Sequence, residues 1–271
     1  MNSNLSVLMY HALTDDMSAP PGADFHYAVT RSKFRQHLEL VRKMGFSASS
    51  VASILASKQN SSRDATAGQI AFTFDDGHES NAAAAADLLA ISGSADLFIN
   101  SSMVGQRNYL DWHALSDLAK AGISIQSHSH THRYLDELSQ NEIKIELAIS
   151  KREIEDHVGV AVTLFAPPGG RMKKCVSGIA QGLGYHGICN SHVGVWKNGA
   201  SPWNIPRFAV LSTTTGVQLT RWINQEKSEL MKLKLRHGLL TSAKILLGNR
   251  GYEGLRSRLL GRGADGSNRG T

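Results

Sequence analysis

Two adjacent carboxylates, Asp75 and Asp76, follow a short apolar run and precede Gly77. The run, residues 70–74, predicts a buried strand, and a glycine after it lets the backbone turn sharply. In β/α folds, the carboxyl ends of strands are where catalytic groups are placed. Two carboxylates there can divide the work, one binding a metal and the other taking a proton. By itself the pair is equally well an ordinary turn, because Asp and Gly are frequent turn residues.

A histidine cluster follows another predicted strand, with His128, His130 and His132 at alternate positions. Neutral imidazole and carboxylate groups are the usual ligands of zinc and its neighbours. Two histidines and one carboxylate leave positions open for water and substrate, which is typical of a catalytic site. We expect His128 and His132 to face the same point if the loop makes one turn, with His130 pointing elsewhere. The alternative is an adventitious metal-binding loop.

The elements that must position these residues alternate along the chain. Strands are predicted at residues 5–10, 70–74, 95–99, 123–126, 162–165, 186–189 and 207–211. Helices are predicted at residues 32–44, 50–57, 81–91, 112–121, 139–157 and 173–183, and a loop at 14–28. The alternation favours an α/β fold with a parallel sheet or barrel. We predict a (β/α) barrel, distorted or one unit short with about seven strands, and keep an open doubly wound sheet as the alternative.

Composition limits the class of protein. The chain has 271 residues, with 41% hydrophobic and 19% charged residues, as expected of a globular protein. No apolar run reaches the length of about 20 residues that a membrane span needs. The first residues lack the features of a signal peptide, so we expect a cytoplasmic protein, with membrane-peripheral attachment as an option. Cys175 and Cys189 match no metal motif and imply no disulfide framework.

The basic charge is concentrated near the C-terminus. Residues 229–262 carry eight Lys or Arg against two Glu, which accounts for the net charge of +6. We therefore divide the chain into a barrel domain at 1–228, with its motifs from about residue 68, a basic helical extension at 229–262 and a disordered tail at 263–271. The extension could contact an anionic membrane or pack on the barrel as a helical pair with a solvated basic face. Nucleic acid is not expected, because no binding motif accompanies the charge.

Together the motifs suggest a family. Residues 73–77 and 128–132 resemble the motifs of the polysaccharide deacetylases, the NodB-homology enzymes of carbohydrate esterase family four. Residues 8–11 and 205–210 resemble the subgroup that contains bacterial exopolysaccharide deacetylases. The resemblance covers roughly residues 5–215 and leaves out the basic extension.

The resemblance implies specific roles. Asp76, His128 and His132 match the metal ligands of the family, and Asp75 matches its catalytic base. Ser129 matches the hydroxyl residue that stabilises the segment at residues 128–132, here called the histidine loop. The implied cofactor is a divalent metal, Zn²⁺ first, with other divalent transition metals as alternatives. The metal would lower the pKa of a bound water and polarise the substrate carbonyl.

The third family motif departs from its common form. Where most members have an arginine and a tyrosine, this chain has Ala166 and Gly169. The backbone N–H of Gly169 can still donate to an oxyanion. Arg207 or Arg171 could replace the missing arginine that orients the base, and we favour Arg207.

The family's general acid is also missing. Most members have a histidine after a final apolar strand, whereas residues 212–215 contain none. His11, after the first strand, and His78, beside the carboxylate pair, are the candidates to replace it. Otherwise Asp75 could act as base and then as acid.

The resemblance implies a metal-dependent hydrolase that removes N-acetyl groups from a carbohydrate. The substrate would be a polysaccharide or a lipid- or nucleotide-linked glycan precursor. Trp203 and Trp196 could provide aromatic platforms for sugar rings or simply pack. The alternatives are a catalytically silent sugar-binding barrel, and a deacetylase or deformylase of a small, non-polymeric substrate.

Overall fold

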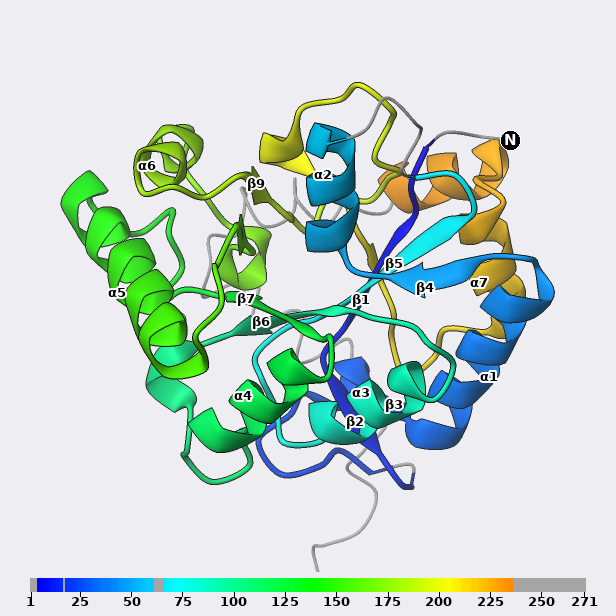
Figure 1. Ribbon diagram of the computed structural model, residues 1–271. Helices are drawn as coiled ribbons and strands as arrows, with labels where there is room; N and C mark the ends of the chain where they lie inside the picture. The colour runs from blue at the N-terminus through cyan, green and yellow to red at the C-terminus, as the bar shows by residue number, and fades with distance from the viewer. Residues whose placement is uncertain (1–3, 17, 61–65, 236–271) are drawn as a thin grey trace, which may run out of the picture. The chain divides into compact units, whose positions relative to one another are not determined.

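The computed structural model describes residues 4–16, 18–60 and 66–235 of the chain. It divides into one compact unit at residues 1–226 and a second at 227–271, and each is described by itself. The first unit contains a curled parallel sheet with helices around it (Figure 1).

The main sheet follows the order β10-β1-β5-β6-β7-β8-β9, with β4 also paired to β5. Its strands are β1 Val7–Tyr10, β4 Ser47–Ser49, β5 Gln69–Phe74, β6 Asp96–Ile99, β7 Ser124–Ser127, β8 Leu164–Phe165, β9 Gly187–Ile188 and β10 Phe208–Ala209. Every pair is parallel, with Val7 opposite Ala71 in the β1–β5 register. A parallel bridge between Cys189 and Ile205 links the end of β9 to the segment before β10. The prediction of a distorted, incomplete (β/α) barrel is confirmed, and the seven predicted strands form the continuous path.

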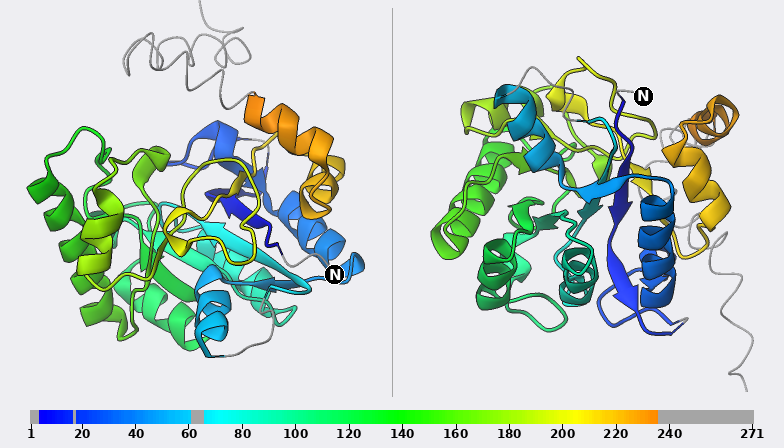
Figure 2. Two further views of the ribbon diagram at one scale, coloured as in Figure 1. Left: turned by 90° about the horizontal axis from the view of Figure 1, so that it is seen from above. Right: turned by 45° about the vertical axis from the view of Figure 1, so that its right-hand side comes forward.

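Helices surround the sheet in the views of Figure 2. The α-helices are α1 Arg31–Lys43, α2 Val51–Asn60, α3 Asn81–Leu89, α4 Trp112–Lys120, α5 Gln140–Val158, α6 Val176–Gly182 and α7 Gly216–Ile223. Short 3₁₀ helices are η1 Phe25–Tyr27, η2 Ser101–Met103, η3 Pro168–Gly170 and η4 Pro202–Asn204. Helix α5 begins at a capping box, in which Ser139 and Glu142 satisfy each other's backbone N–H groups.

Some predictions of secondary structure were wrong. The predicted loop at 14–28 contains η1, and its ends belong to a parallel pair, β2 Ala12–Thr14 and β3 Ala28–Thr30. Helix α7 was not predicted, although it too begins at a capping box, formed by Thr215 and Gln218. These segments are short, so hydrophobic periodicity has few residues on which to act.

The alternation of side chains along β5 explains which face of the sheet its polar side chains occupy. Phe72 and Phe74 lie on one face, where they stack against Tyr10 and pack edge-on to Phe34 of α1. The other face carries Thr73, whose buried hydroxyl donates to the carbonyl of Leu8 and accepts from Arg207. Because side chains alternate with period two along a strand, Asp75 follows Thr73 onto the face away from the phenylalanines.

The basic extension is described only at its start. Residues 227–235 are helical, with Met231 and Leu235 exposed. The rest of the predicted extension, and the tail predicted at 263–271, lie outside the described residues. Within the part of the chain that the structure describes, no helix has the length and apolarity to cross a membrane.

Candidate active site

Asp75 and Arg207 form a buried ion pair at the end of β5. Arg207 immediately precedes β10, and its guanidinium donates to both oxygens of Asp75, over 2.7 Å to Oδ1 and 2.8 Å to Oδ2. It also donates to Thr73 and to the carbonyl of Asn190, so the guanidinium is held on several sides. Burial opposes the charge on Asp75, yet Arg207 and His128 hold the pKa of Asp75 below its usual value. Asp75 is therefore ionised and fixed in orientation at neutral pH.

Three further side chains converge beside this pair. The Nε2 atoms of His128 and His132 both lie 3.3 Å from Oδ1 of Asp76. His128 is buried, whereas Asp76 and His132 are 36% and 40% exposed, so the group opens to solvent on one side. Burial raises the pKa of Asp76, but hydrogen bonds from the two imidazoles outweigh it and leave that pKa well below its usual value. In the described residues this is the one group of His, Cys, Asp and Glu whose ligand atoms converge in this way.

The donor set fits a divalent metal. Nδ1 of His128 lies 2.8 Å from the carbonyl oxygen of Ala166, which can only accept, so Nδ1 keeps a proton and Nε2, once its own proton leaves, would offer its lone pair to a metal. Ligand atoms 3.3 Å apart match the edge of a tetrahedron with bonds of about 2.0–2.1 Å, the length usual for zinc. Asp76, His128 and His132 are thus the residues that would hold the metal.

The loop between the two histidines has an unusual backbone. Ser129 and His132 both adopt positive φ, at 70° and 58°. The hydroxyl of Ser129 accepts the backbone N–H of His132 over 3.2 Å. His130 turns away from Asp76, with Nδ1 at 2.9 Å from Ser101 and 3.1 Å from Glu153. Two histidines facing one point with the third turned away is the arrangement predicted from the sequence.

Gly169 lies in η3 after β8 with φ of 59°. A Cβ at this position would come within 2.9 Å of Cε1 of Tyr134, so the aromatic ring occupies the space that a side chain would need. The guanidinium of Arg171 stacks on the same ring and pairs with Asp136 and Glu137. Of the two arginines considered as partners of the base, Arg207 reaches Asp75 and Arg171 has acidic partners of its own.

His11 follows β1 and lies near both carboxylates of the site. Its ring packs on Tyr27, with centroids 4.3 Å apart, and its buried Nδ1 has no hydrogen-bond partner in the described structure. Burial lowers the pKa of His11, and the charges of Asp76 and Asp75 oppose that shift. The ring is neutral near pH 7 and is close enough to feel both charges.

Other candidate residues are held elsewhere. Both ring nitrogens of His78 have partners outside the site, Ser80 at 2.8 Å and the carbonyl of Pro21 at 3.0 Å. Trp203 lies in η4, where Pro202 approaches Gly187 of β9 and Asn204 bonds to Asn190. Trp196 is buried in the core and pairs with Leu5 before β1. We therefore do not assign these three residues to the site.

Sequence reasoning missed two kinds of contributor. One is the carbonyl of Ala166, which orients His128, and the other is Glu146, a buried acid of α5 that contacts the histidine loop. A carbonyl has no sequence signature. Glu146 could have been noticed as a charged residue on the helix face where Ile143 and Leu147 are buried.

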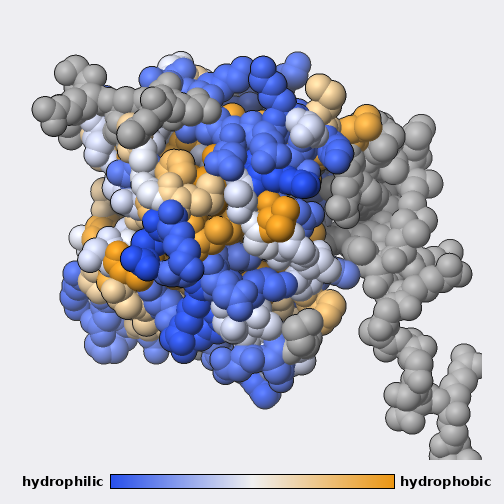
Figure 3. Space-filling model, turned by 90° about the vertical axis from the view of Figure 1, so that its right-hand side faces the viewer, coloured by the Kyte–Doolittle hydropathy of each residue, from blue (hydrophilic) through white to orange (hydrophobic). Residues whose placement is uncertain are grey.

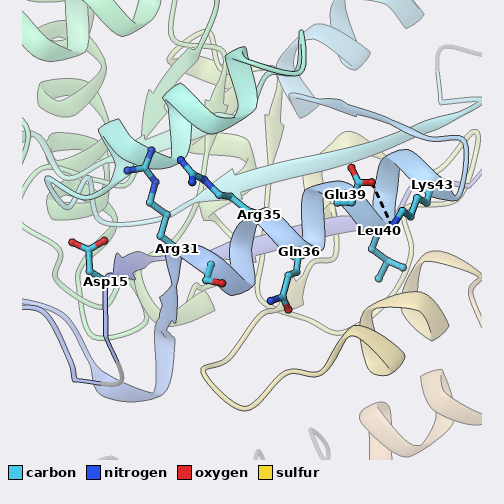
Figure 4. A pocket seen from close by; sticks show the side chains of 8 residues that line it. Asp15, Arg31, Arg35, Gln36, Glu39, Leu40 and Lys43 are labelled. Carbon is cyan, nitrogen blue, oxygen red and sulfur yellow. Dashed lines mark ion pairs between the residues drawn. The ribbon is translucent and has the colours of Figure 1, made fainter.

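A hollow on the outside of the molecule is not the site. It runs along α1, which belongs to a largely hydrophilic face with small apolar patches (Figures 3 and 4). Arg31 and Arg35 in its wall reach Asp87 of α3, and Glu39 pairs with Lys43. These four charges already have partners within the chain, so they do not require a ligand.

Comparison with solved structures identifies the same fold. The Streptococcus pyogenes deacetylase PplD, solved in complex with acetate, superposes with a TM-score of 0.72 at 20% identity, covering 81% of this chain and 98% of that one. IcaB from Ammonifex degensii gives a TM-score of 0.67 at 20% identity, with 81% and 97% covered.

Sequence comparison agrees. Bacillus subtilis YxkH, whose name assigns it provisionally to the polysaccharide deacetylases, is 25% identical over 186 residues, 68% of this chain. The match spans 63% of that relative's length. Residues 62–188, which include Asp75, Asp76 and the histidine loop, match the family model described as polysaccharide deacetylase. Over residues 62–188 the chain therefore matches the polysaccharide deacetylase family, and it shares the fold of solved deacetylases.

Proposed function

We propose that this chain is a metal-dependent hydrolase that removes N-acetyl groups from a carbohydrate. The observation that carries the proposal is the placement of an ionised, arginine-bound carboxylate beside a set of three metal-ligand atoms. Two histidines and one carboxylate form an open ligand set, which leaves room for water and a substrate carbonyl. The match of residues 62–188 to the polysaccharide deacetylase family supports this chemistry.

Different residues of the chain are assigned to different steps of the reaction. A divalent metal, Zn²⁺ first, would supply an acidified water and polarise the acetamide carbonyl. Asp75 takes the proton of the attacking water, and the pair with Arg207 keeps it ionised and aimed. Each carboxylate oxygen retains a second lone pair, so hydrogen bonding to Arg207 does not prevent Asp75 from accepting a proton. The N–H of Gly169 is assigned to the developing oxyanion.

His11 is our choice for the group that delivers a proton to the leaving amine: because its ring is neutral near pH 7, it would first accept the proton that Asp75 takes from the water and then pass it on. Its unpartnered Nδ1 and its nearness to both carboxylates support this role, whereas His78 is already engaged through both ring nitrogens. The remaining alternative is that Asp75 returns the proton it has taken.

Acetate release tests the proposal. Zinc-loaded protein is incubated with a panel of N-acetylated oligosaccharides and nucleotide-linked sugars, and acetate is measured for the wild type and for Asp75→Asn. We expect release by the wild type and a loss of about 10²–10⁴-fold in the variant, the range for a general base. Bound zinc with no acetate from any sugar would instead favour the silent sugar-binding barrel. Release from small amides alone would favour the non-polymeric substrate.

For the finer placement, we propose a cytoplasmic enzyme that works on glycan precursors at an anionic membrane surface. The described start of the extension supports it, because Met231 and Leu235 are exposed four residues apart and are interleaved with Lys232 and Lys234. Co-sedimentation of the full chain and of a chain ending at residue 228 with anionic and neutral vesicles tests it. Equal sedimentation of both chains with anionic vesicles would exclude a role for the extension.

A further inference from the structure

Helix α5 carries a polar stripe where a buried helix would ordinarily be apolar. Glu146, Ser150 and Glu153 are spaced by four and three residues, which places them on one face of the helix. Helix α5 packs against β7, the strand that precedes the histidine loop (Figure 1). The stripe lies among buried apolar residues of the same helix: Ile143, Leu147 and Ile154.

Glu146 accepts hydrogen bonds from the middle of the histidine loop. Its Oε2 accepts the backbone N–H of His130 over 3.0 Å and that of Thr131 over 2.8 Å, and its Oε1 accepts the hydroxyl of Thr131. Glu146 is only 6% exposed. His130 and Thr131 lie between the two ligand residues, so one carboxylate holds the segment that sets the spacing of His128 and His132.

The rest of the stripe extends this attachment to the start of the loop and to the side chain of His130. Ser150 hydrogen bonds to Ser127 over 2.8 Å, and the hydroxyl of Ser127 accepts the N–H of Ser129 over 3.3 Å. Glu153 pairs with the ring of His130. The loop is therefore fastened to one helix through side chains that are not themselves ligands.

A buried carboxylate at this place needs an explanation. Burying a charge is unfavourable unless several donors compensate it. Packing alone would be served by an apolar residue, as at Leu147 one position along. The compensation for Glu146 comes from the loop, which must hold Ser129 and His132 at positive φ, a conformation that non-glycine residues adopt only under constraint.

We propose that Glu146 is a positioning residue for the metal site: it fixes the loop so that Nε2 of His128 and Nε2 of His132 both face Asp76. The role rests on the proposed function only in that the three-residue group binds a metal. Glu146 touches neither the ligand atoms nor the substrate and acts through the backbone of residues 130 and 131.

The test compares metal binding in Glu146→Gln with that of the wild type. Glutamine keeps the size of the side chain but removes its charge, so the N–H groups of His130 and Thr131 would face a weaker acceptor and the Thr131 hydroxyl would have to accept rather than donate. We expect the zinc Kd, measured by chelator competition, to rise about 10–100-fold, the usual range for outer contacts of metal ligands. The visible absorption spectrum of the cobalt-substituted protein should also change, because it reports ligand geometry.

The matched control is Glu155→Gln on the same helix. Glu155 bonds to Lys151 and to the N–H of Val162, and makes no contact with the histidine loop. We expect it to lower thermal stability without changing the zinc Kd or the cobalt spectrum. If Glu146→Gln does not fold, Thr131→Ala removes only the exposed hydroxyl's bond to Glu146, and we expect a several-fold rise in zinc Kd.

The outcomes separate the two proposals. Wild-type protein that binds neither zinc nor cobalt would overturn the proposed metal site, and the role of Glu146 with it. Wild-type binding together with an unchanged Kd and spectrum in Glu146→Gln would overturn the positioning role alone. The same would follow if Glu155→Gln weakened zinc binding as much as Glu146→Gln.

Discussion

Asp75 follows β5 and His128 follows β7, so both lie at the same edge of the sheet. Different contacts hold the two side chains in place. On the base side, Asp75 is bound by the charged fork of Arg207, a residue 132 positions away in the chain. On the histidine side, His128 and the loop through His132 are held by a carbonyl, by Ser129 and by an acid of α5.

The chemistry of each residue accounts for the difference. A base must be ionised in a buried place, and the paired cation keeps Asp75 ionised there without leaving its charge uncompensated. A metal-binding histidine must be neutral with its proton on the correct nitrogen, which a carbonyl acceptor such as that of Ala166 ensures. The two sides can therefore be damaged separately, and the predictions below use this.

Arg207→Met should have the largest effect and should act on the base side. It leaves Asp75 buried without its cation, and we expect a loss of about 3–5 kcal/mol in the free energy of unfolding. Chemical denaturation measures the loss. Arg207→Lys should keep the charge but lose the two parallel bonds. Because the pKa of Asp75 is then depressed less, the acidic limb of the rate profile should move to higher pH.

An unchanged acidic limb in Arg207→Lys would contradict the assignment of Asp75 as the base whose pKa Arg207 lowers. The zinc Kd should stay near the wild-type value in this variant, since its contacts lie on the base side.

Gly169→Ala should come next and should act on the segment after β8 that also supports His128. The new Cβ meets Tyr134 at 2.9 Å and the backbone keeps φ of 59°. We expect about 2 kcal/mol of destabilisation from strain and contact together, measured by urea unfolding. Gly105→Ala is the control. Gly105 has φ of 78° and no atom lies within 4 Å of an added Cβ, so this variant should lose stability through backbone strain alone. Equal losses of unfolding free energy in the two variants would show that the Tyr134 ring moves aside at no cost.

Ser129→Gly should affect the histidine side without strain, since glycine tolerates the φ of 70° found there. The variant loses the hydroxyl that accepts the N–H of His132. We expect the zinc Kd to rise about 10-fold. Isothermal titration measures it, and the acidic limb of the rate profile should not move. A shifted limb with normal zinc binding would reverse the division between the two sides.

Asp87→Asn should have the smallest effect and should touch neither side. Asp87 pairs with Arg31 and Arg35, and these contacts lower its pKa to about 2. Since the folded pKa lies below the ordinary value, this stabilisation is present above about pH 4 and is lost as the pH falls toward 2. We expect about 1 kcal/mol at pH 7, because both arginines are partly exposed. Denaturation at pH 7 and pH 2.5 checks it: the difference between wild type and variant should be clearly smaller at the lower pH, with activity at pH 7 unchanged.

Much of the fold could be predicted because the seven strands of the path each have an apolar run bounded by turn residues. The residues that escaped prediction lack such a pattern. Strand β4, Ser47–Ser49, has a serine at each end and pairs only because the chain places it beside β5. Strands β2 and β3 depend equally on their partner, since three residues cannot form a strand alone.

The sequence by itself determined the types and local order of the reacting groups: two carboxylates after a strand, and two histidines four residues apart after another. Local patterns suffice there because strand ends and loop turns depend on neighbouring residues. Tertiary structure alone decided that Arg207 rather than Arg171 binds Asp75, that His78 is engaged elsewhere and that Glu146 holds the histidine loop. Each of these pairs a buried polar group with a distant partner, and which partner it meets depends on how the sheet curls and which helix face covers it.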